Sequence, residues 1–231
     1  MISVSILIPA FNEEKTILQI LEKVKAVKFD GVDMEVIVID DGSQDKTVEL
    51  LEANPKLYQT LIKMPANGGK GAAVKAGIAA ASGDYILFQD ADLEYDPADY
   101  RRLFSPALEY QADVIMGSRF IAPACMRVSY FWHKVGNCLI TFIFNILHNT
   151  AFTDIYSCYL MYRRDLVDPN NLKTLGWEQQ AEILSTAVQN GKVFYEVPIN
   201  YHGRTYEDGK KIRAHHTIPV VWTMFRMRIF G

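Results

Sequence analysis

Two clusters of acidic residues each follow an apolar run of this chain. Asp40-Asp41-Gly42-Ser43 closes the first run, and Asp90-Ala91-Asp92-Leu93-Glu94 closes the second. Each apolar run predicts a buried strand, and ligands of open α/β sheets bind just beyond the carboxyl ends of such strands. Carboxylates placed there are costly unless they meet hydrogen-bond donors, water or a metal. We therefore predict that Asp40 and Asp41 contact a nucleobase edge and ribose hydroxyls, with helix capping as the alternative role.

The second cluster has the composition of a site for a hard divalent cation. Asp90, Asp92 and Glu94 occupy alternating positions, which puts their side chains on one side of an extended segment. One or two of them could hold Mg²⁺ or Mn²⁺ while a diphosphate supplies further oxygen ligands. The alternative is an exposed acidic turn. Because the acids directly follow a buried strand, we predict a metal that binds together with a nucleotide diphosphate.

A glycine-rich segment, Asn67-Gly68-Gly69-Lys70-Gly71, precedes an alanine-rich stretch that predicts a helix. Glycines permit close backbone approach, and a helix N-terminus attracts anions. Lys70 could therefore reach a phosphate. The segment lacks the spacing and the Lys-Ser/Thr ending of a Walker loop, so on its own it indicates a turn more often than a site.

Basic residues that could recognise a phosphate gather beyond the predicted sheet. Arginine suits bidentate phosphate recognition, although scattered arginines usually provide only surface charge. We favour Arg204 and Arg119, the latter because Gly117-Ser118 places it just past a strand. The full set is Arg119, Arg127, Lys134, Arg204, Lys210, Lys211 and Arg213.

Glu178 and Glu182 lie four residues apart on a predicted helix and therefore share a face. One of them is a candidate general base, although the spacing alone favours an ordinary solvated face. The adjacent pair His215-His216 is not expected to bind a metal jointly, because neighbouring side chains point apart. We expect these histidines to lie at the surface or at an interface.

The elements that must position these residues alternate between strands and helices. Apolar runs predict strands, whereas apolar residues at helical spacing, such as Ile17, Leu21 and Val24, predict helices. The alternation predicts a doubly wound α/β fold with a mostly parallel sheet over residues 1–120. The predicted strands cover 4–8, 35–39, 61–63, 85–88 and 114–116, and predicted helices begin near residues 12, 43, 72 and 97.

Composition limits the class of protein. The chain has 231 residues, of which 49% are hydrophobic and 22% charged, and this supports one sizeable domain. A net charge of −3 argues against a general nucleic-acid binder. The chain does not open with a basic segment followed by an apolar one, so no signal peptide is expected. The apolar run 139–147 is far short of the ~20 residues that a membrane-spanning helix needs, so no such helix is expected. The cysteines Cys125, Cys138 and Cys158 lack metal-like spacing and are expected to be reduced thiols in the cytosol.

In this order, the motifs resemble those of the family 2 glycosyltransferases with the GT-A fold. They are most similar to the polyprenyl-phosphate sugar transferases, such as dolichol-phosphate mannose synthase. The resemblance implies one GT-A domain with a Rossmann-like, mostly parallel sheet, helices on both faces and a C-terminal acceptor-side appendage. The likeness covers nearly the whole chain, and its matching segments are 8–13, 38–47, 67–71, 89–94, 117–119, 154–164 and 204–212.

The resemblance implies inverting transfer of a sugar from a nucleotide-diphosphate sugar, of the GDP-mannose or UDP-glucose type, to a polyprenyl or dolichyl phosphate. Residues 1–120 would bind the nucleotide sugar and residues 121–231 the acceptor. A phosphate acceptor is already anionic and needs little help from a base, while the metal stabilises the leaving diphosphate. By analogy the nucleotide site comprises Pro9, Phe11, Glu13, Asp40, Asp41, Lys70 and Asp90, and the metal site comprises Asp90, Asp92 and Glu94. The acceptor site would comprise Arg119, Arg127, Arg204 and Lys210. The catalytic residues would be Asp92, Arg119 and Arg204.

Three segments depart from the pattern of this family. Phe11 replaces a common tyrosine, which removes a hydroxyl group but keeps the stacking face. Residues 157–160 lack a lysine that relatives often carry, and residues 213–216 replace a stretch similar to Trp-Lys-Asp-Gly. These departures concern the acceptor and the sugar, and they leave the nucleotide and metal motifs unchanged.

Other functions compete with this interpretation. A glycosyltransferase acting on a glycan hydroxyl would need a base, and Glu178 or Glu182 would then be essential. A non-catalytic nucleotide-binding subunit is disfavoured by the intact acidic clusters. A Rossmann oxidoreductase is rejected, because residues 9–14 lack the Gly-x-Gly-x-x-Gly fingerprint.

Two apolar stretches bear on the location of the protein. Residues 139–147 and 220–230 could form amphipathic helices on a membrane surface, with Arg226 and Arg228 toward lipid headgroups. Core packing or a dimer contact is an equal alternative. We expect a cytoplasmic protein with peripheral contact to the inner face of the membrane.

Overall fold

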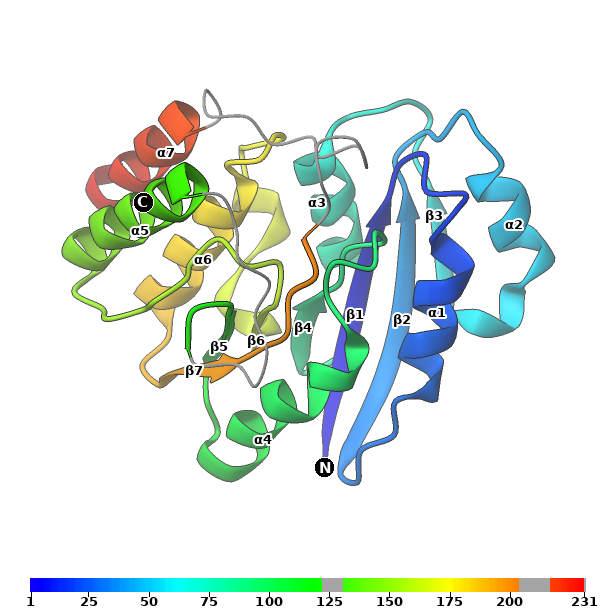
Figure 1. Cartoon of the computed structure of the whole chain (residues 1–231), viewed down its shortest axis with the longest axis horizontal. Coiled ribbons are helices and arrows are strands. Elements are labelled where there is room, and N and C mark those ends of the chain that lie inside the picture. Colours follow the sequence, from blue (N-terminus) through cyan, green and yellow to red (C-terminus); the bar gives the residue numbers. More distant parts are fainter. Residues whose placement is uncertain (122–130, 204–216, 231) are drawn as a thin grey trace.

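The computed structural model describes residues 1–121, 131–203 and 217–230. Its centre is a seven-stranded sheet with the strand order β3-β2-β1-β4-β6-β5-β7 (Figure 1). The strands are β1 (Ile2–Ala10), β2 (Val32–Asp40), β3 (Thr60–Lys63), β4 (Tyr85–Phe88), β5 (Val114–Ser118), β6 (Leu160–Arg163) and β7 (Phe194–Pro198).

The sheet is mostly parallel, as predicted. β1 pairs in parallel with β2 and β4, β2 with β3, and β5 with β7. Within the described ranges, β6 is the strand that runs antiparallel to its neighbours, β4 and β5. All the strands expected from the apolar runs are present, whereas β6 and β7 were not predicted. Because β6 lies between β4 and β5, one sheet joins the two halves of the chain.

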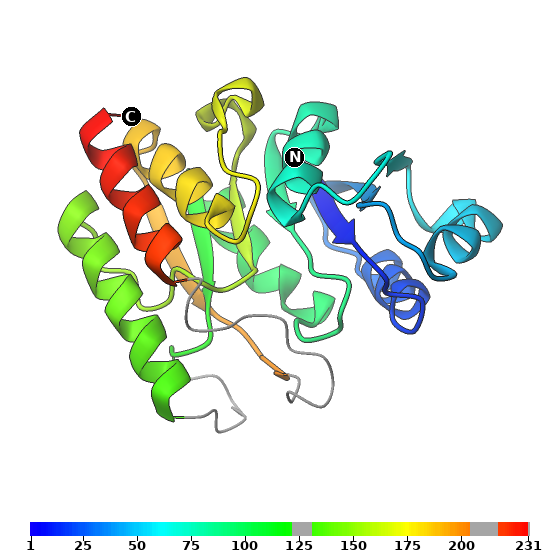
Figure 2. The ribbon, with the colours of Figure 1, turned by 90° about the horizontal axis from the view of Figure 1, so that it is seen from above.

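Helices cover both faces of this sheet. Figure 2 shows α1 (Ile17–Ala26) and α4 (Tyr100–Tyr110) on one face, and α3 (Lys70–Ala80) and α6 (Gln179–Asn190) on the other. Helix α7 (Thr217–Phe230) packs between α6 and α5 (Phe131–His148), and α5 and α7 form an outer layer at the end of the sheet that carries β5 and β7. The remaining helices are α2 (Thr47–Ala53), η1 (Pro55–Leu57), η2 (Pro97–Asp99), η3 (Arg164–Leu166) and η4 (Pro169–Asn171).

Burial on both faces explains why the central strands are continuous apolar runs in the sequence. The apolar residues from Val4 to Ile8 in β1 and from Ile37 to Ile39 in β2 are fully buried, because helices cover both faces of these parallel strands. Helix α1 instead buries a single stripe at helical spacing, made by Ile17, Ile20, Leu21 and Val24.

Helix α1 begins later than the sequence predicts. Residues 11–16 form a turn before the helix, because their polar groups bind the turn that follows β2. The N–H of Asn12 donates to Ser43 Oγ at 2.9 Å, and Asn12 Oδ1 accepts from the Gln44 N–H at 2.8 Å. The N–H of Glu13 donates to Thr47 Oγ1 at 2.9 Å. These bonds compete with helix formation and tie the first two sequence motifs together.

The register of the sheet brings the motif-bearing ends of the strands to one edge. Ala10 at the end of β1 lies opposite Asp40 at the end of β2, and β4 ends just before Asp90. β5 ends just before Arg119, and its parallel neighbour β7 ends at Pro198. In the described part of the chain, no helix has the length and apolar character needed to cross a membrane.

Candidate active site

A cavity of about 760 Å³ lies beyond the carboxyl ends of β1, β2, β4 and β5. Its walls come from both halves of the chain, including the outer helices α5 and α7. The structure therefore brings together most of the described residues that the sequence singled out. Those that line the cavity are Pro9, Phe11, Glu13, Asp41, Lys70, Asp90, Asp92, Glu94 and Arg119.

Asp40 supports the site from behind the cavity wall. Its side chain is buried at 2% exposure, and its Oδ2 accepts from the N–H groups of Gly42 and Ser43 at 3.1 Å each. Its Oδ1 has no hydrogen-bond partner among the described residues. Asp40 does not line the cavity and orders the turn after β2, and its contact with a nucleoside stays a prediction.

Asp41 connects this turn to the glycine-rich segment. Its Oδ1 accepts from the Gly68 N–H at 2.8 Å and its Oδ2 from the Gly69 N–H at 3.0 Å. Burial raises the pKa of Asp41, and these two hydrogen bonds oppose that rise. The Gly71 N–H donates to the Leu175 carbonyl at 2.9 Å. These N–H groups thus bind protein acceptors, as in the turn that the sequence favoured for this segment on its own.

Lys70 is the part of the glycine-rich segment that faces the cavity. Its Nζ lies 2.6 Å from Asp90 Oδ1 and 5.5 Å from the centroid of the Trp177 ring. Burial disfavours the charge on Lys70, but Asp90 outweighs burial and raises the pKa of Lys70 above its ordinary value. The ammonium is therefore charged and lies at the cavity beside Asp90.

Cys158 also contacts Asp90 at this wall. Burial in the first place, and the Asp90 carboxylate in the second, raise the pKa of the Cys158 thiol well above its ordinary value. A neutral thiol is a poor nucleophile. Cys158 therefore acts as a hydrogen-bonding neighbour of Asp90.

Asp92 and Glu94 lie on the turn after β4. Asp92 Oδ1 accepts from the Glu94 N–H at 3.1 Å, and Glu94 Oε2 accepts from the Tyr201 hydroxyl at 2.9 Å. Among the described residues no three His, Cys, Asp or Glu side chains form a ligand set, so Asp90, Asp92 and Glu94 do not together make a complete metal site by themselves. Asp90 and Asp92 both offer oxygen at the cavity. This donor set fits a Mg²⁺ or Mn²⁺ ion that takes its other ligands from a diphosphate.

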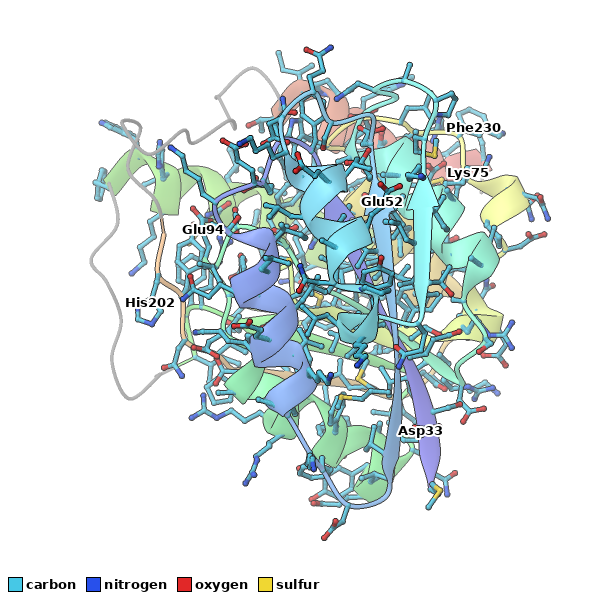
Figure 3. The ribbon with its side chains drawn as sticks, turned by 90° about the vertical axis from the view of Figure 1, so that its right-hand side faces the viewer. Asp33, Glu52, Lys75, Glu94, His202 and Phe230 are labelled. Carbon is cyan, nitrogen blue, oxygen red and sulfur yellow. The ribbon has the colours of Figure 1, made fainter. Side chains whose placement is uncertain are left out.

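The segment after β7 closes over this acidic turn. The His202 N–H donates to the Glu94 carbonyl at 2.9 Å, and Tyr95 forms an isolated antiparallel bridge with Tyr201. Figure 3 shows Glu94 and His202 at one edge of the molecule, away from Asp33 near the start of β2. The second half of the chain thus holds this acidic turn in place.

Arg119 is fixed at the cavity by a buried carboxylate. Its Nε and Nη2 donate to the two oxygens of Asp154 at 2.6 and 2.8 Å, and the Asp154 side chain is 0% exposed. The guanidinium also lies 5.2 Å from the centroid of the Tyr201 ring. The Asp154 N–H donates in turn to Glu196 Oε1 at 3.1 Å. The arginine is therefore preorganised by Asp154, the first residue of the matching segment 154–164, through a pairing that the sequence did not predict.

The two candidate bases do not line the cavity. Glu182 is buried at 1% exposure, and its carboxylate accepts from Lys173, from Thr174 and from Arg226 Nη2 at 2.8 Å. The prediction of a solvated helix face is therefore wrong for Glu182, and its engaged oxygens exclude a role as base. Glu178 lies at the N-cap of α6, outside the cavity lining.

Several predicted residues lie outside the described residues. They include the acceptor candidates Arg127, Arg204 and Lys210, whose proposed roles stay predictions. The others are Cys125, Lys211, Arg213, His215 and His216.

Aromatic residues of the cavity are the main group that sequence reasoning missed. Tyr156, Trp177 and Tyr201 all line it. Each stands within three residues of a position that was singled out, namely Asp154, Glu178 or Arg204. Aromatic side chains in loops beside polar motifs were the available signal, since binding residues concentrate on loops carried by a rigid scaffold.

Comparison with known proteins agrees with this geometry. Residues 5–169 match the model of glycosyl transferase family 2. The low-salt glycan biosynthesis hexosyltransferase Agl6 of Haloferax volcanii is 30% identical over 208 residues, which are 89% of this chain and 49% of that protein. The undecaprenyl-phosphate 4-deoxy-4-formamido-L-arabinose transferase of Proteus mirabilis is 32% identical over 170 residues, which are 71% of this chain and 50% of that protein. The chain thus spans about half the length of these two relatives.

A solved structure shares the fold. Glucosyl-3-phosphoglycerate synthase from Mycobacterium tuberculosis, crystallised with Mn²⁺, uridine diphosphate and phosphoglyceric acid, matches with a TM-score of 0.73 and 19% identity. The match covers 100% of this chain and 80% of that chain, and it confirms the predicted GT-A fold. From the family match and the similar relatives, the chain belongs to glycosyl transferase family 2.

Proposed function

We propose that the protein transfers a sugar, with inversion, from a nucleotide-diphosphate sugar to a polyprenyl phosphate. The observation that carries this proposal is the asymmetry of the cavity. Acids and Lys70 lie on the wall at the ends of β1, β2 and β4, whereas the described lining on α5, α6 and α7 contains no carboxylate. One wall suits a metal-bound diphosphate, and the other, where His133 of α5 is the ionisable side chain of the described lining, suits a nucleophile that needs no carboxylate base.

The donor half would use residues of the first sheet edge. Phe11 offers a ring face to a base, and Glu13 and Asp41 offer oxygens to hydroxyl or base N–H groups. The ammonium of Lys70 would release Asp90 and bind a diphosphate oxygen instead, since the carboxylate and the diphosphate are both anionic acceptors. The nucleotide is of the GDP or UDP type, and the sugar is a hexose such as mannose or glucose.

A divalent cation would be held by Asp90 and Asp92. When bound, Mg²⁺ or Mn²⁺ neutralises charge that develops on the leaving diphosphate. This requirement is supported by the oxygen donors at the cavity and by the Mn²⁺ in the crystals of the M. tuberculosis synthase. Lys70 adds a second positive charge on the same side.

The acceptor half would orient a phosphate with arginine. Arg119 faces the cavity in a fixed orientation, and the predictions add Arg127, Arg204 and Lys210. An ionised phosphate oxygen attacks the anomeric carbon directly, so the arginines position the nucleophile and no proton needs to be removed. The name of the P. mirabilis relative, an undecaprenyl-phosphate transferase, supports an acceptor of this class.

A membrane surface would deliver such a lipid acceptor. Helices α5 and α7 contain no acidic residue, carry exposed Lys134 and Arg228, and also wall the cavity, so an anionic bilayer fits their shared outer face. Arg226, which was expected to face headgroups, instead pairs with Glu182. The large exposed apolar residues are Phe131, Trp132, Leu139, Phe142 and Ile146 on α5, and Ile218, Trp222, Phe225, Ile229 and Phe230 on α7.

Vesicle sedimentation tests this surface. We expect the protein to bind vesicles that contain phosphatidylglycerol, and Trp222→Asp to lose most of that binding. Tyr110→Asp, a change at an exposed aromatic residue of α4, should keep it. Equal binding by both variants, or dimerisation that Trp222→Asp abolishes without vesicles, would contradict a bilayer as the partner.

A glycan hydroxyl acceptor is the second candidate, favoured by the glycan-biosynthesis name of the H. volcanii relative. Candidates for its base are His133, which lines the cavity on α5, Glu178, and residues outside the described ranges such as Glu207 or Asp208. A non-catalytic nucleotide-binding subunit is the third candidate. Loss of turnover in a folded Asp92→Asn variant would exclude it.

A thermal-shift screen tests the donor class. The purified protein is heated with GDP-, UDP- and dTDP-sugars, with and without Mn²⁺, because a ligand that binds the native state raises the Tm. We expect a shift with one nucleotide class that requires the metal and disappears in Asp92→Asn. Asp33→Asn, an exposed acid remote from the cavity, is the control and should shift like the natural chain. No shift with any nucleotide sugar would argue against the proposal.

A further inference from the structure

The segment of residues 173–177 links the acceptor side of the cavity to the glycine-rich segment. The Leu175 carbonyl accepts from the Gly71 N–H, and a Cβ on Gly71 would lie only 2.6 Å from the Leu175 carbonyl carbon. Trp177 lines the cavity and lies under the ammonium of Lys70. The position of Lys70 therefore depends on where this segment runs.

A buried carboxylate holds the start of the segment in place, while the Tyr156 hydroxyl donates to the Trp177 carbonyl at 2.7 Å at its end. Glu182 accepts from the Lys173 N–H at 3.1 Å, from the Thr174 N–H at 2.8 Å and from Thr174 Oγ1 at 2.5 Å. It also pairs with Arg226 Nη2 of α7 at 2.8 Å. A carboxylate is suited to these contacts, since it only accepts hydrogen bonds and all of its partners here donate them.

We propose that Glu182 is a positioning residue for the donor subsite. Together with Arg226 it fixes residues 173–177, and that segment holds Trp177 and Gly71 where Lys70 can meet the donor diphosphate. The proposal rests on the proposed function, because it takes the ligand near Lys70 to be a nucleotide-diphosphate sugar. It also connects α7, whose outer face is apolar, to the donor side of the cavity through Arg226.

The chemistry of the amide explains why Glu182→Gln is an informative change. Glutamine has nearly the same shape, but it offers one acceptor oxygen and one NH₂ group. If the oxygen serves Thr174, the NH₂ faces Arg226, and if the oxygen serves Arg226, the NH₂ faces the Thr174 donors. Either orientation places donors against donors and loosens one end of the segment.

Three variants separate positioning from general packing. Glu182→Gln loosens the segment, and Thr174→Val removes only the hydroxyl donor while it preserves the shape of the side chain. Gln189→Ala is the matched control, since Gln189 Nε2 donates to the Met227 carbonyl at 2.8 Å and so also links α6 to α7, without touching residues 173–177. Urea unfolding selects variants that are folded.

Two readouts test the inference. In the ligand-free protein, amide hydrogen exchange at residues 68–71 and 173–177 should rise at least tenfold in Glu182→Gln and remain unchanged in Gln189→Ala. With the nucleotide sugar that the thermal-shift screen identifies, Glu182→Gln should raise the donor Kd and KM about tenfold, change kcat at saturating donor less than threefold and leave the acceptor KM unchanged. Thr174→Val should show the same pattern with a smaller change.

The outcomes keep this inference apart from the proposed function. A natural chain that binds no nucleotide sugar refutes the proposed function, and hydrogen exchange then decides whether Glu182 positions the segment. Normal exchange and normal donor Kd in folded Glu182→Gln overturn the inference. The same losses in Gln189→Ala also overturn it, because they would come from the packing of α6 on α7 in general.

Discussion

The ion pair between Arg119 and Asp154 predicts a large and specific effect on stability. Arg119 was expected to bind the acceptor, yet its Nε and Nη2 both donate to Asp154, which is fully buried. Arg119→Ala would leave that carboxylate buried without its charged partner. Removal of one member of a buried pair costs about 3–5 kcal/mol. For a domain of this size we therefore expect the Tm to fall by about 6–20 °C.

A double-mutant cycle separates this structural role from a role in binding. Asp154→Asn should destabilise the natural chain but should be neutral or stabilising in the Arg119→Ala background, because it removes the unpaired charge. We expect a coupling free energy of at least about 2 kcal/mol in urea unfolding. The exposed pair Lys63 and Glu52, at 2.7 Å, is the control and should couple by less than about 1 kcal/mol.

The refuting result is equally definite. A coupling below about 0.5 kcal/mol between Arg119 and Asp154 would mean that the buried bidentate pair does not hold Arg119 in place. If the pair is coupled as expected, Arg119→Ala loses activity partly because it is destabilised. Its activity alone then cannot show whether Arg119 binds the acceptor. The double variant, restored in stability, is then the protein in which acceptor KM should be measured.

Three further predictions concern the glycine-rich segment and the pH dependence of stability. Gly71→Ala should lower the free energy of unfolding in urea by about 1–3 kcal/mol, because its Cβ meets the backbone of Leu175, whereas Gly136→Ala, with open space around it, should be neutral or stabilising. Asp41→Asn should cost about 1–3 kcal/mol in the same assay, since an amide cannot accept from both Gly68 and Gly69; an unchanged midpoint would show that this carboxylate does not hold the loop. Burial, and then Arg228, lower the pKa of His148 from 6.5 to about 4, so the unfolded chain takes up the proton first and stability is lost as the pH falls from about 6.5 toward 4. After allowance for partial solvent screening, His148→Gln should remove about 1 kcal/mol of the stability difference between pH 7 and pH 5, and an identical pH profile in both proteins would contradict this assignment.

Local patterns were enough to predict the first half of the fold. The strands over 4–8 and 35–39 were recognisable because parallel strands buried on both faces read as continuous apolar runs. Their ends then located Asp41 and Asp90 at the cavity, since the carboxyl ends of parallel strands meet at one edge.

The second half depended on tertiary contacts that no local pattern reveals. β6 has four residues and pairs antiparallel between β4 and β5, so its place in the sheet is set by partners distant in sequence. Spacing put Glu182 on a helix face, but only the packing of α7 shows that this face is covered and that Arg226 is its partner. Likewise, no local pattern reveals that Asp41 accepts from the N–H groups of Gly68 and Gly69.

Transfer of a labelled sugar is the most direct test of the central claim. The natural chain and Asp92→Asn are incubated with the nucleotide sugar identified by thermal shift, Mn²⁺, and either a polyprenyl phosphate, the matching polyprenol or a glycan. The account predicts a lipid-extractable product with the polyprenyl phosphate alone, and none from Asp92→Asn. Product with the glycan but not with the polyprenyl phosphate, or full transfer by Asp92→Asn, would contradict it.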